Sequence, residues 1–399
     1  MSNPMRILYD HQIFTQQHYG GVSRYFCELM SQFSKDPTMD FSIALRCSQN
    51  KNLQKCYELD EYWSNRNNFF SRTQLFSFIQ KVTHRDILTF LLNNKILCIG
   101  QQESVRELKK QNFDIFHPTY YDPYFLKHLG KKPFVLTVYD MIHEVHPEYF
   151  SPESPTARWK KQLIEKAGSI IAISESTKKD IIKFIDVDPE KIQVIYLGSP
   201  FESMIDSDEA IDIPSHSPMY GKSYILFVGN RSSYKNFKFL IETIAPLLVK
   251  DNELQVCCAG GEPFTPPEIL FLKNLQISHK VHHVQPNERS MKKLYKNALV
   301  FIFPSLYEGF GLPVLEAFSS GCPALLSNTS SLPEIGGDAA LYFDPHDSAT
   351  LKDAFEHIIS DNSLRIKLIL KGYERSILFS WEKTASATKN VYENAINVK

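Results

Sequence analysis

The stretch Pro304–Glu316 reads PSLYEGFGLPVLE, and it decides how the second half of this chain folds. It follows Ala298–Phe303, a continuous apolar run with β-favouring residues that predicts a buried parallel strand. Downstream, Pro313 suits the start of a helix and Gly321 its C-terminal cap, so we expect a helix from about Pro313 to Ser320. The positive end of that helix faces the two glycines of the stretch, a geometry that suits a phosphate group.

Two carboxylates, Glu308 and Glu316, lie on either side of these glycines and are separated by seven residues. We expect Glu308 at the mouth of the loop and Glu316 in the first helical turn. A carboxylate beside an anion site does not bind the phosphate, but it accepts hydrogen bonds from hydroxyl groups. A nucleotide sugar supplies both phosphates and hydroxyls. The alternative is an ordinary strand, loop and helix in which a glutamate caps the helix.

A second group of polar residues follows another predicted strand, Tyr224–Gly229. Arg231, Lys235 and Asn236 occupy the loop between this strand and a helix that begins near Phe237. If the two strands are neighbours, both cations face the same cleft as the glycine loop. Arg231 is then suited to bind a pyrophosphate bidentately, and Lys235 to act as a point charge. The alternative is a solvated basic loop.

The whole chain alternates strand and helix signals. With 399 residues it predicts two domains, and a Ser-, Pro- and Asp-rich segment from Ser199 to Ser223 is the expected linker. Alternating elements of this kind favour parallel, doubly wound sheets with ligands at the carboxyl ends of the strands. The strands are expected near 5–10, 114–117, 133–138, 169–173, 192–196, 223–229, 254–259, 281–284, 299–303 and 323–327. Helices are expected near 23–34, 155–167 and 176–185.

Composition excludes several classes of protein. The net charge of −1 argues against a nucleic-acid binder, and seven scattered cysteines are typical of a reduced, cytoplasmic protein. There is no signal-peptide pattern, no apolar run of the about 18 residues needed to span a bilayer, and no Gly-x-Gly-x-x-Gly. Asp186-x-Asp188 matches a metal-binding pattern, but the two aspartates lie in a connection before Pro189 and are explained as turn residues. A zinc site at His279, His282 and His283 is not expected, because a fourth ligand is lacking. We therefore expect no metal and no nicotinamide cofactor.

The segment Phe76–Leu97 is rich in Phe, Leu and Ile, with basic residues between them. One interpretation is a pair of surface helices that touches a lipid acceptor or the membrane interface, which would make the protein peripheral to the membrane. The other, which we favour, is a buried helix with a basic face.

Taken together, the Glu-x7-Glu spacing and its Pro-Ser and Gly-Leu-Pro flanks resemble the signature of retaining glycosyltransferases of family 4. Gly-x-Arg-x-x-x-Lys-Asn at 229–236 is similar to the place where that family stabilises the departing diphosphate with Arg and Lys. Gly20-Gly21 resembles the family's glycine loop against the donor phosphates and the acceptor. The resemblance covers nearly the whole chain and implies the GT-B fold, two Rossmann-like doubly wound α/β domains facing a central cleft.

One departure from the family concerns Tyr139, which stands where many members have a histidine near the transferred sugar. Asp140 and His143 are the candidates to take over its polar contacts. Phe379-Ser-Trp-Glu382 resembles the start of the family's C-terminal helix, so we expect residues 381–399 to pack back on the first domain.

The resemblance implies that residues 1–200 form an acceptor-side domain and residues 201–380 a nucleotide-sugar domain. It also implies a retaining transfer of a hexosyl unit, with mannosyl favoured, from a GDP- or UDP-linked donor without a metal ion. The acceptor would be a hydroxyl of a surface polysaccharide or of a lipid-linked glycan precursor. A non-hydrolysing nucleotide-sugar epimerase and a non-catalytic sugar-nucleotide-binding subunit are the alternatives.

The resemblance also assigns a role to each residue of the site. Glu308 contacts hydroxyls of the donor sugar, and Glu316 accepts from the ribose hydroxyls. Phosphate or sugar oxygens bind the backbone N–H groups of three loop residues, Phe310, Gly311 and Leu312. The catalytic residues expected are Glu308, Arg231, Lys235 and Asp140, and the donor-binding residues are Gly20, Gly21, Gly229, Asn236, Phe310, Gly311, Leu312 and Glu316.

Overall fold

The computed structural model describes residues 3–59, 86–199, 223–231 and 233–397. Within these residues the chain forms two compact units. The first unit contains residues 1–173, 177–197 and 381–399, and the second contains 174–176 and 198–380. Residues 200–222, which include nearly all of the expected linker, lie outside the described residues.

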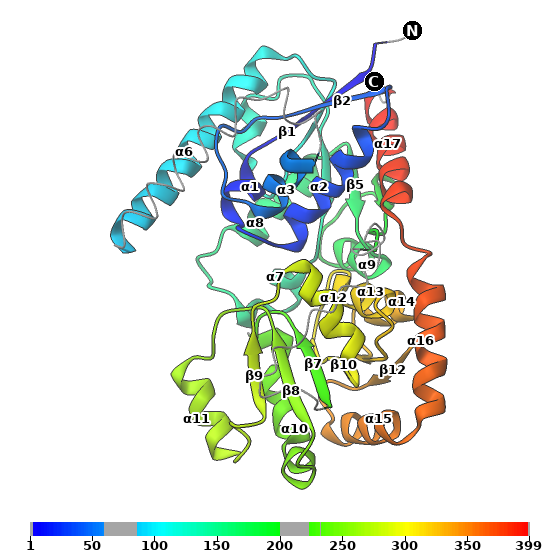
Figure 1. Ribbon diagram of the computed structural model, residues 1–399. Helices are drawn as coiled ribbons and strands as arrows, with labels where there is room; N and C mark the ends of the chain where they lie inside the picture. Colours follow the sequence, from blue (N-terminus) through cyan, green and yellow to red (C-terminus); the bar gives the residue numbers. More distant parts are fainter. Residues whose placement is uncertain (1–2, 60–85, 200–222, 232, 398–399) are drawn as a thin grey trace. The chain divides into compact units, whose positions relative to one another are not determined.

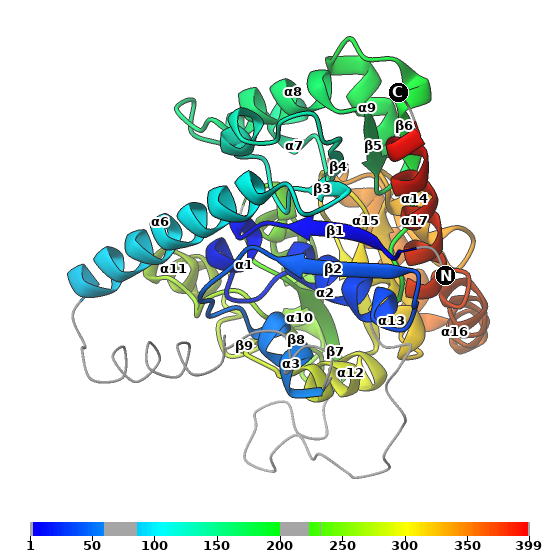
Figure 2. The same cartoon turned by 90° about the horizontal axis from the view of Figure 1, so that it is seen from above.

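The first unit is built on parallel strands in the order β2-β1-β3 and β4-β5-β6. A single bridge between Phe116 and Phe134 joins the two groups, and Figure 2 shows β1 and β2 side by side. The strands are β1 (Met5–Tyr9), β2 (Met39–Ile43), β3 (Ile115–His117), β4 (Val135–Val138), β5 (Ser169–Ala172) and β6 (Ile192–Val194). The helices are α1 (Gln12–Gln16), α2 (Gly21–Phe33), α3 (Lys51–Leu59), α6 (Asp86–Lys110), α7 (Ile142–Val145), α8 (Thr156–Lys166), α9 (Glu175–Phe184) and α17 (Trp381–Asn397).

The second unit contains one parallel sheet in the order β12-β11-β10-β7-β8-β9. Its strands are β7 (Tyr224–Val228), β8 (Gln255–Ala259), β9 (Val281–Val284), β10 (Val300–Phe303), β11 (Ala324–Ser327) and β12 (Ala340–Phe343). Its helices are α10 (Phe237–Lys250), α11 (Pro266–Asn274), α12 (Glu288–Asn297), α13 (Leu312–Ser319), α14 (Leu332–Gly336), α15 (Ser348–Ser360) and α16 (Asn362–Ser376). Strands buried on both faces explain the unbroken apolar runs in the sequence.

The ten expected strands and the helices expected near 23–34, 155–167, 176–185 and 313–320 are present, each within two residues of the predicted bounds. Two further strands, β2 and β12, were not predicted, although Met39–Ile43 alternates apolar and polar residues and Ala340–Phe343 is apolar throughout; each run is only four or five residues long. The core of the second unit includes Ile225 and Phe227 of β7, which pack with Leu240 and Ile244 of α10. Each such side chain contributes about 1.5–3 kcal/mol when it is fully buried.

The C-terminal helix α17, drawn in red in Figure 1, packs against α2 and also contacts β3, β4 and β5 in the first unit. Its Tyr392 is fully buried and bonds to His117 of β3, with 2.7 Å between the hydroxyl oxygen and Nδ1. Thr384 donates to the carbonyl oxygen of Tyr196 at 2.8 Å. The chain thus returns to its first unit at residue 381.

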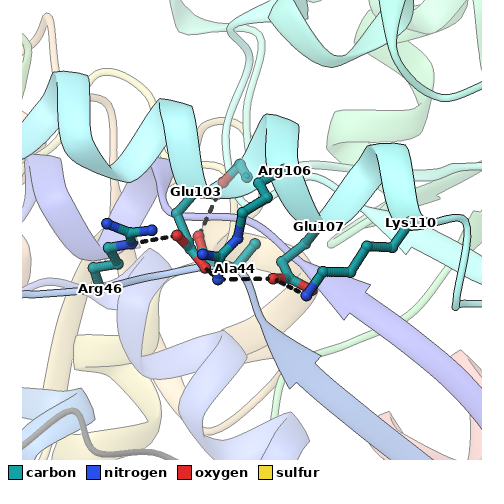
Figure 3. A network of polar contacts seen from close by, with 7 residues as sticks. Ala44, Arg46, Glu103, Arg106, Glu107 and Lys110 are labelled. Carbon is teal, nitrogen blue, oxygen red and sulfur yellow. Dashed lines mark hydrogen bonds and ion pairs between the residues drawn. The ribbon is translucent and has the colours of Figure 1, made fainter.

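Charged side chains fasten the C-terminal part of α6 to the segment after β2 (Figure 3). Glu103, whose side chain is buried, pairs with both Arg46 and Arg106. Glu107 continues the network to Lys110, and Lys110 Nζ lies 2.7 Å from the Glu107 carboxylate.

Of the apolar segment expected at Phe76–Leu97, residues 76–85 lie outside the described residues, and the membrane interpretation stays a prediction. Within the described part of the chain, no helix combines the length and apolar character needed to cross a membrane.

Candidate functional site

The candidate site of the second unit lies where the strand order reverses. Strands β7 and β10 are parallel neighbours, with Val300 opposite Ile225 and Phe301 opposite Leu226. The next strands along the chain, β8 and β11, lie on the outer sides of this pair. Loops that leave β7 and β10 at their carboxyl ends therefore meet at a topological switch point, where open α/β sheets bind their ligands.

Lys235 and Glu308 meet at this switch point. Lys235 ends a short 3-10 turn, Ser233–Lys235, after β7, and Glu308 lies in the loop after β10. Lys235 Nζ lies 2.6 Å from Glu308 Oε1, and both side chains are largely buried. The backbone N–H of Glu308 donates to Ser330 Oγ at 2.9 Å. The structure therefore brings together the predicted cation and the predicted sugar-binding carboxylate.

Asn236 and Gly311 give these loops their sharp turns. Asn236 has a left-handed backbone, with φ of 56°, and its side chain donates to the carbonyl oxygen of Pro345 at 2.9 Å. Gly311 is the N-cap of α13 with φ of 108°, a conformation that a residue with a Cβ adopts only under strain. Ser331 Oγ donates to the carbonyl oxygens of Glu308 and Phe310, and these bonds hold the loop between β10 and α13 in place.

The position of Glu316 corrects one prediction. Helix α13 begins at Leu312, so Glu316 is its fifth residue and lies in the second turn rather than the first. Tyr295 of α12 donates its hydroxyl to Glu316 Oε2 at 2.9 Å. Sequence reasoning missed Tyr295, because no local pattern on α12 shows that its fully buried ring reaches a carboxylate on another helix.

Arg231 contacts helix α11 and the loop before it, whereas the sequence predicts that it binds a diphosphate. Its Nε donates to Glu268 Oε1 at 2.7 Å, and its Nη2 donates to the carbonyl oxygens of Glu262 and Pro263 at 2.7 and 3.3 Å. The guanidinium lies 4.5 Å from the ring centroid of Phe264, and the side chain is 5% exposed. The predicted contact between Arg231 and a diphosphate therefore stays a prediction that this side-chain orientation does not favour.

Gly229 directly follows β7 and lies beside Gly260 and Gly261, which directly follow β8. Its φ is 116°, and a Cβ built on it meets open space. Gly260 and Gly261, at the end of β8, also have positive φ, and a Cβ on Gly261 would lie 3.1 Å from the carbonyl oxygen of Gly229. The backbones of the two loops are thus in close contact, and the space above Gly229 is available to a ligand.

In the first unit, Asp140 follows β4 and lies beside a buried lysine. Lys160 of α8 has no exposed side-chain area, and its Nζ donates to the carbonyl oxygen of Asp140 and to Glu144 Oε2, both at 2.9 Å. Asp140 Oδ1 accepts from the backbone N–H of Ile142 at 3.1 Å. Tyr139 is buried, its backbone N–H bonding to the hydroxyl of Tyr121, and burial raises its pKa well above the ordinary value. Tyr139 therefore presents a neutral phenol at this position.

Gly20 and Gly21 begin α2, with Gly20 as its N-cap. The carbonyl oxygen of Gly20 accepts from Ser23 Oγ and Asn52 Nδ2, each at 3.1 Å. Sequence reasoning also missed Asp10, a fully buried carboxylate after β1. It accepts from Thr119 Oγ1 at 2.6 Å and from the Tyr124 hydroxyl at 3.0 Å, so it orders the loops after β1 and β3.

Profiles of two families match the chain. Glycosyl transferases group 1 matches residues 209–375, and Glycosyltransferase Family 4 matches residues 19–201. O-antigen chain mannosyltransferase B of Escherichia coli is 27% identical over 325 residues, covering 78% of this chain and 83% of the relative. D-inositol 3-phosphate glycosyltransferase of Corynebacterium glutamicum is 24% identical over 322 residues, covering 74% and 76%.

Solved structures share the fold across the whole chain. A glycosyltransferase of Rickettsia africae superposes with a TM-score of 0.67 at 18% identity, and each chain is covered completely. Sucrose-phosphate synthase of Thermosynechococcus elongatus gives 0.73 at 16% identity, also with complete coverage of both. HepE of Anabaena, solved with UDP and glucose, gives 0.65 at 14% identity and covers 98% of this chain and 100% of its own.

The parallel sheets, the switch-point loops and these matches define a glycosyltransferase with the GT-B fold. The chain belongs to family 4 of these enzymes, the group 1 glycosyltransferases.

Proposed function

We propose that this enzyme transfers a mannosyl unit, with retention of anomeric configuration, from a nucleotide sugar to a hydroxyl group of a surface polysaccharide or its lipid-linked precursor. The ion pair of Lys235 with Glu308 at the switch point is the main observation behind this proposal. A sugar phosphate needs a cation for its phosphate and a hydrogen-bond acceptor for its hydroxyl groups, and this pair supplies both. The mannosyl choice and the acceptor rest on the relative named O-antigen chain mannosyltransferase B.

Lys235 is the residue that we assign to the leaving diphosphate. Cleavage of the bond between sugar and phosphate builds negative charge on the diphosphate, and a preorganised cation stabilises this charge most in the transition state. The first N–H groups of α13, after Gly311, add partial positive charge at the same loop. We propose that these groups offset the diphosphate charge without a metal ion.

The carboxylates have separate roles in this proposal. Glu308 accepts hydrogen bonds from hydroxyls of the donor sugar while its partner Lys235 turns to the phosphate. Glu316, held by Tyr295, accepts from the ribose hydroxyls. Retention through two displacements needs a carboxylate nucleophile that the sequence does not identify. We therefore favour a front-face reaction in which the leaving phosphate helps to deprotonate the acceptor hydroxyl.

A thermal-shift assay with GDP, UDP, ADP and their hexose conjugates, in the presence of EDTA, tests the donor site first. A selective rise in Tm identifies the base and shows binding to the native state without a divalent metal. The selected donor is then incubated with acceptor glycans. Consumption of the donor without an acceptor would point to an epimerase, and binding without turnover over a broad acceptor panel to a non-catalytic subunit. No shift with any nucleotide would refute the donor site.

A further inference from the structure

The orientation of Arg231 is set by one carboxylate that also caps a helix. Glu268 is the third residue of α11, and its Oε2 accepts from the N–H and the hydroxyl of Thr265, both at 2.8 Å. Its other oxygen, Oε1, accepts from Arg231 Nε at 2.7 Å. A single side chain thus closes the capping box of α11 and holds the arginine of the preceding β7 loop.

The lowered pKa of Glu268 is consistent with a stable ion pair between Glu268 and Arg231. Burial by itself raises the pKa of Glu268, but the hydrogen bonds from Arg231 and Thr265 outweigh it and keep the pKa below the ordinary value. The carboxylate is therefore ionised at neutral pH, and the bond from Arg231 is charge-assisted. Removal of one partner leaves the other charge partly buried without compensation, which is more costly than the loss of an exposed pair.

The pair connects the two glycine loops beside the switch point. Arg231 lies two residues after Gly229 in the β7 loop, and Glu262 and Pro263, whose carbonyl oxygens it binds, directly follow Gly261 in the β8 loop. Gly261 in turn packs closely on Gly229. Because Nε and Nη2 are occupied and the side chain is 5% exposed, Arg231 is built into the protein between these loops rather than presented to solvent.

One guanidinium nitrogen, Nη1, is buried without a hydrogen-bond partner. A Cβ on Gly261 would lie 3.6 Å from it, so Nη1 sits directly beside the glycine turn. Its positive charge therefore lies next to the Gly261 backbone, which itself packs on Gly229. An arginine that bound phosphate by its fork would need Nη1 and Nη2 or Nη2 and Nε together, and two of these three nitrogens are already taken.

We infer that Arg231 and Glu268 are positioning residues that hold the glycine turn Gly260–Gly261 against Gly229, and that they act on the nucleotide diphosphate through this backbone rather than by direct contact. The inference deepens the proposed function and rests on it, because it concerns the same donor site. It adds Glu268 to the residues that matter for the donor and changes the role of Arg231.

A double-mutant cycle distinguishes positioning from direct contact. We would prepare Arg231→Gln, Glu268→Gln and the double variant, and measure by calorimetry their affinity for the nucleoside diphosphate that the thermal-shift assay selects. Positioning by a pair predicts that each single variant and the double variant all lose roughly tenfold in affinity, because the second change removes nothing further. The donor KM should rise by a similar factor while kcat changes little.

Direct contact predicts a different pattern. Arg231→Gln would then lower kcat strongly, and Glu268→Gln would leave affinity and kcat near normal; this result would overturn the inference. Losses that multiply in the double variant would also overturn it. Thr265→Ala is the matched control, since it removes the cap hydroxyl while Arg231 and Glu268 stay paired, and its affinity should stay within about threefold of wild type.

Hydrogen exchange in the nucleotide-free protein gives a readout that does not depend on the donor. Glu268→Gln should speed exchange in segments 229–231 and 260–265 and leave α15 and α16 unchanged. Unchanged exchange in both segments would refute the fastening role. Failure of the wild-type protein to bind any nucleotide would instead refute the proposed function, and the two failures are therefore distinguishable.

Discussion

Lys235 and Glu308 show how neighbouring strands turn distant residues into one site. They lie far apart in the sequence, yet the parallel pairing of β7 with β10 places their loops at one sheet edge, where Nζ and Oε1 are 2.6 Å apart. Removal of most water from the pair strengthens its electrostatic interaction. We propose that the pair also holds Lys235 near the position of the donor diphosphate before the donor binds.

Lys235→Ala should lower kcat by at least about a hundredfold, because the charge that builds on the leaving diphosphate then lacks its cation. Initial rates with the selected donor measure the effect, and circular dichroism checks that the fold is intact. Lys371→Ala, which removes an ion pair with Asp338 elsewhere in the second unit, is the control and should leave kcat near wild type. Near-normal turnover in Lys235→Ala would exclude Lys235 from the chemistry.

At the scale of elements, two connections set the local architecture: the glycine turn into α13 and the return of α17 to the first unit. The turn depends on a backbone conformation that the glycine supplies. The return depends on side chains, since Tyr392 bonds to His117 and lies 3.1 Å from the hydroxyl of Tyr9. Each can be tested by a change of one residue.

Gly311→Ala should destabilise the second unit by about 1–3 kcal/mol, because a residue with a Cβ is strained at φ of 108°. The new Cβ would also lie 3.1 Å from Leu332 Cδ2. Urea denaturation measures the change, with Gly168→Ala as the control, since a Cβ there meets nothing within 4 Å and φ is not positive. Equal stability of the two variants would contradict the strain argument.

Tyr392→Phe should lower the free energy of unfolding by about 1–3 kcal/mol. The loss of one hydroxyl leaves His117 Nδ1 and the Tyr9 hydroxyl without their common partner in a fully buried environment. Chemical denaturation compares this variant with Tyr373→Phe, in which the side chain is 45% exposed and little change is expected. A loss in Tyr373→Phe as large as that in Tyr392→Phe would rule out the buried network as the cause.

At the scale of the molecule, burial of ionisable groups makes stability depend on pH. His117 is fully buried, and desolvation lowers its pKa to about 3 from an ordinary value of 6.5. Below pH 6.5 the unfolded chain takes up a proton that the folded chain does not take up until about pH 3. The stability that the neutral imidazole contributes is therefore complete above pH 6.5 and falls as the pH is lowered through this window.

The free energy of unfolding should fall as the pH drops from about 6.5 to 4, and His117 should contribute up to about 1.4 kcal/mol per pH unit of that slope. Denaturation at several pH values should give a shallower slope for His117→Gln than for wild type. Identical slopes would contradict the assignment. NMR titration of the His117 ring in the wild-type protein is an independent check, and a ring that is protonated at pH 5 would also refute it.

Local patterns in the sequence predict most of the strands and helices and the polar residues of the candidate site. Continuous apolar runs predicted the strands because parallel strands are buried on both faces, and glycines with positive φ, at 229, 311 and 321, stand where the chain turns. The spacing of Glu308, Glu316, Lys235 and Asn236, together with the resemblance to family 4, predicts a donor site at these residues. These signals are local, since each depends on residues within one strand, loop and helix.

Which side chains meet depends on how the elements pack in three dimensions. The partners of the predicted residues come from other elements: Tyr295 of α12 for Glu316, Glu268 of α11 for Arg231 and Lys160 of α8 for Asp140. No spacing rule links them, because their distances along the chain depend on the helices and strands between. The strand order of each sheet decides which loops are neighbours. The loop after β7 lies beside the loop after β8, and Arg231 therefore pairs with Glu268, which the sequence around Arg231 does not indicate.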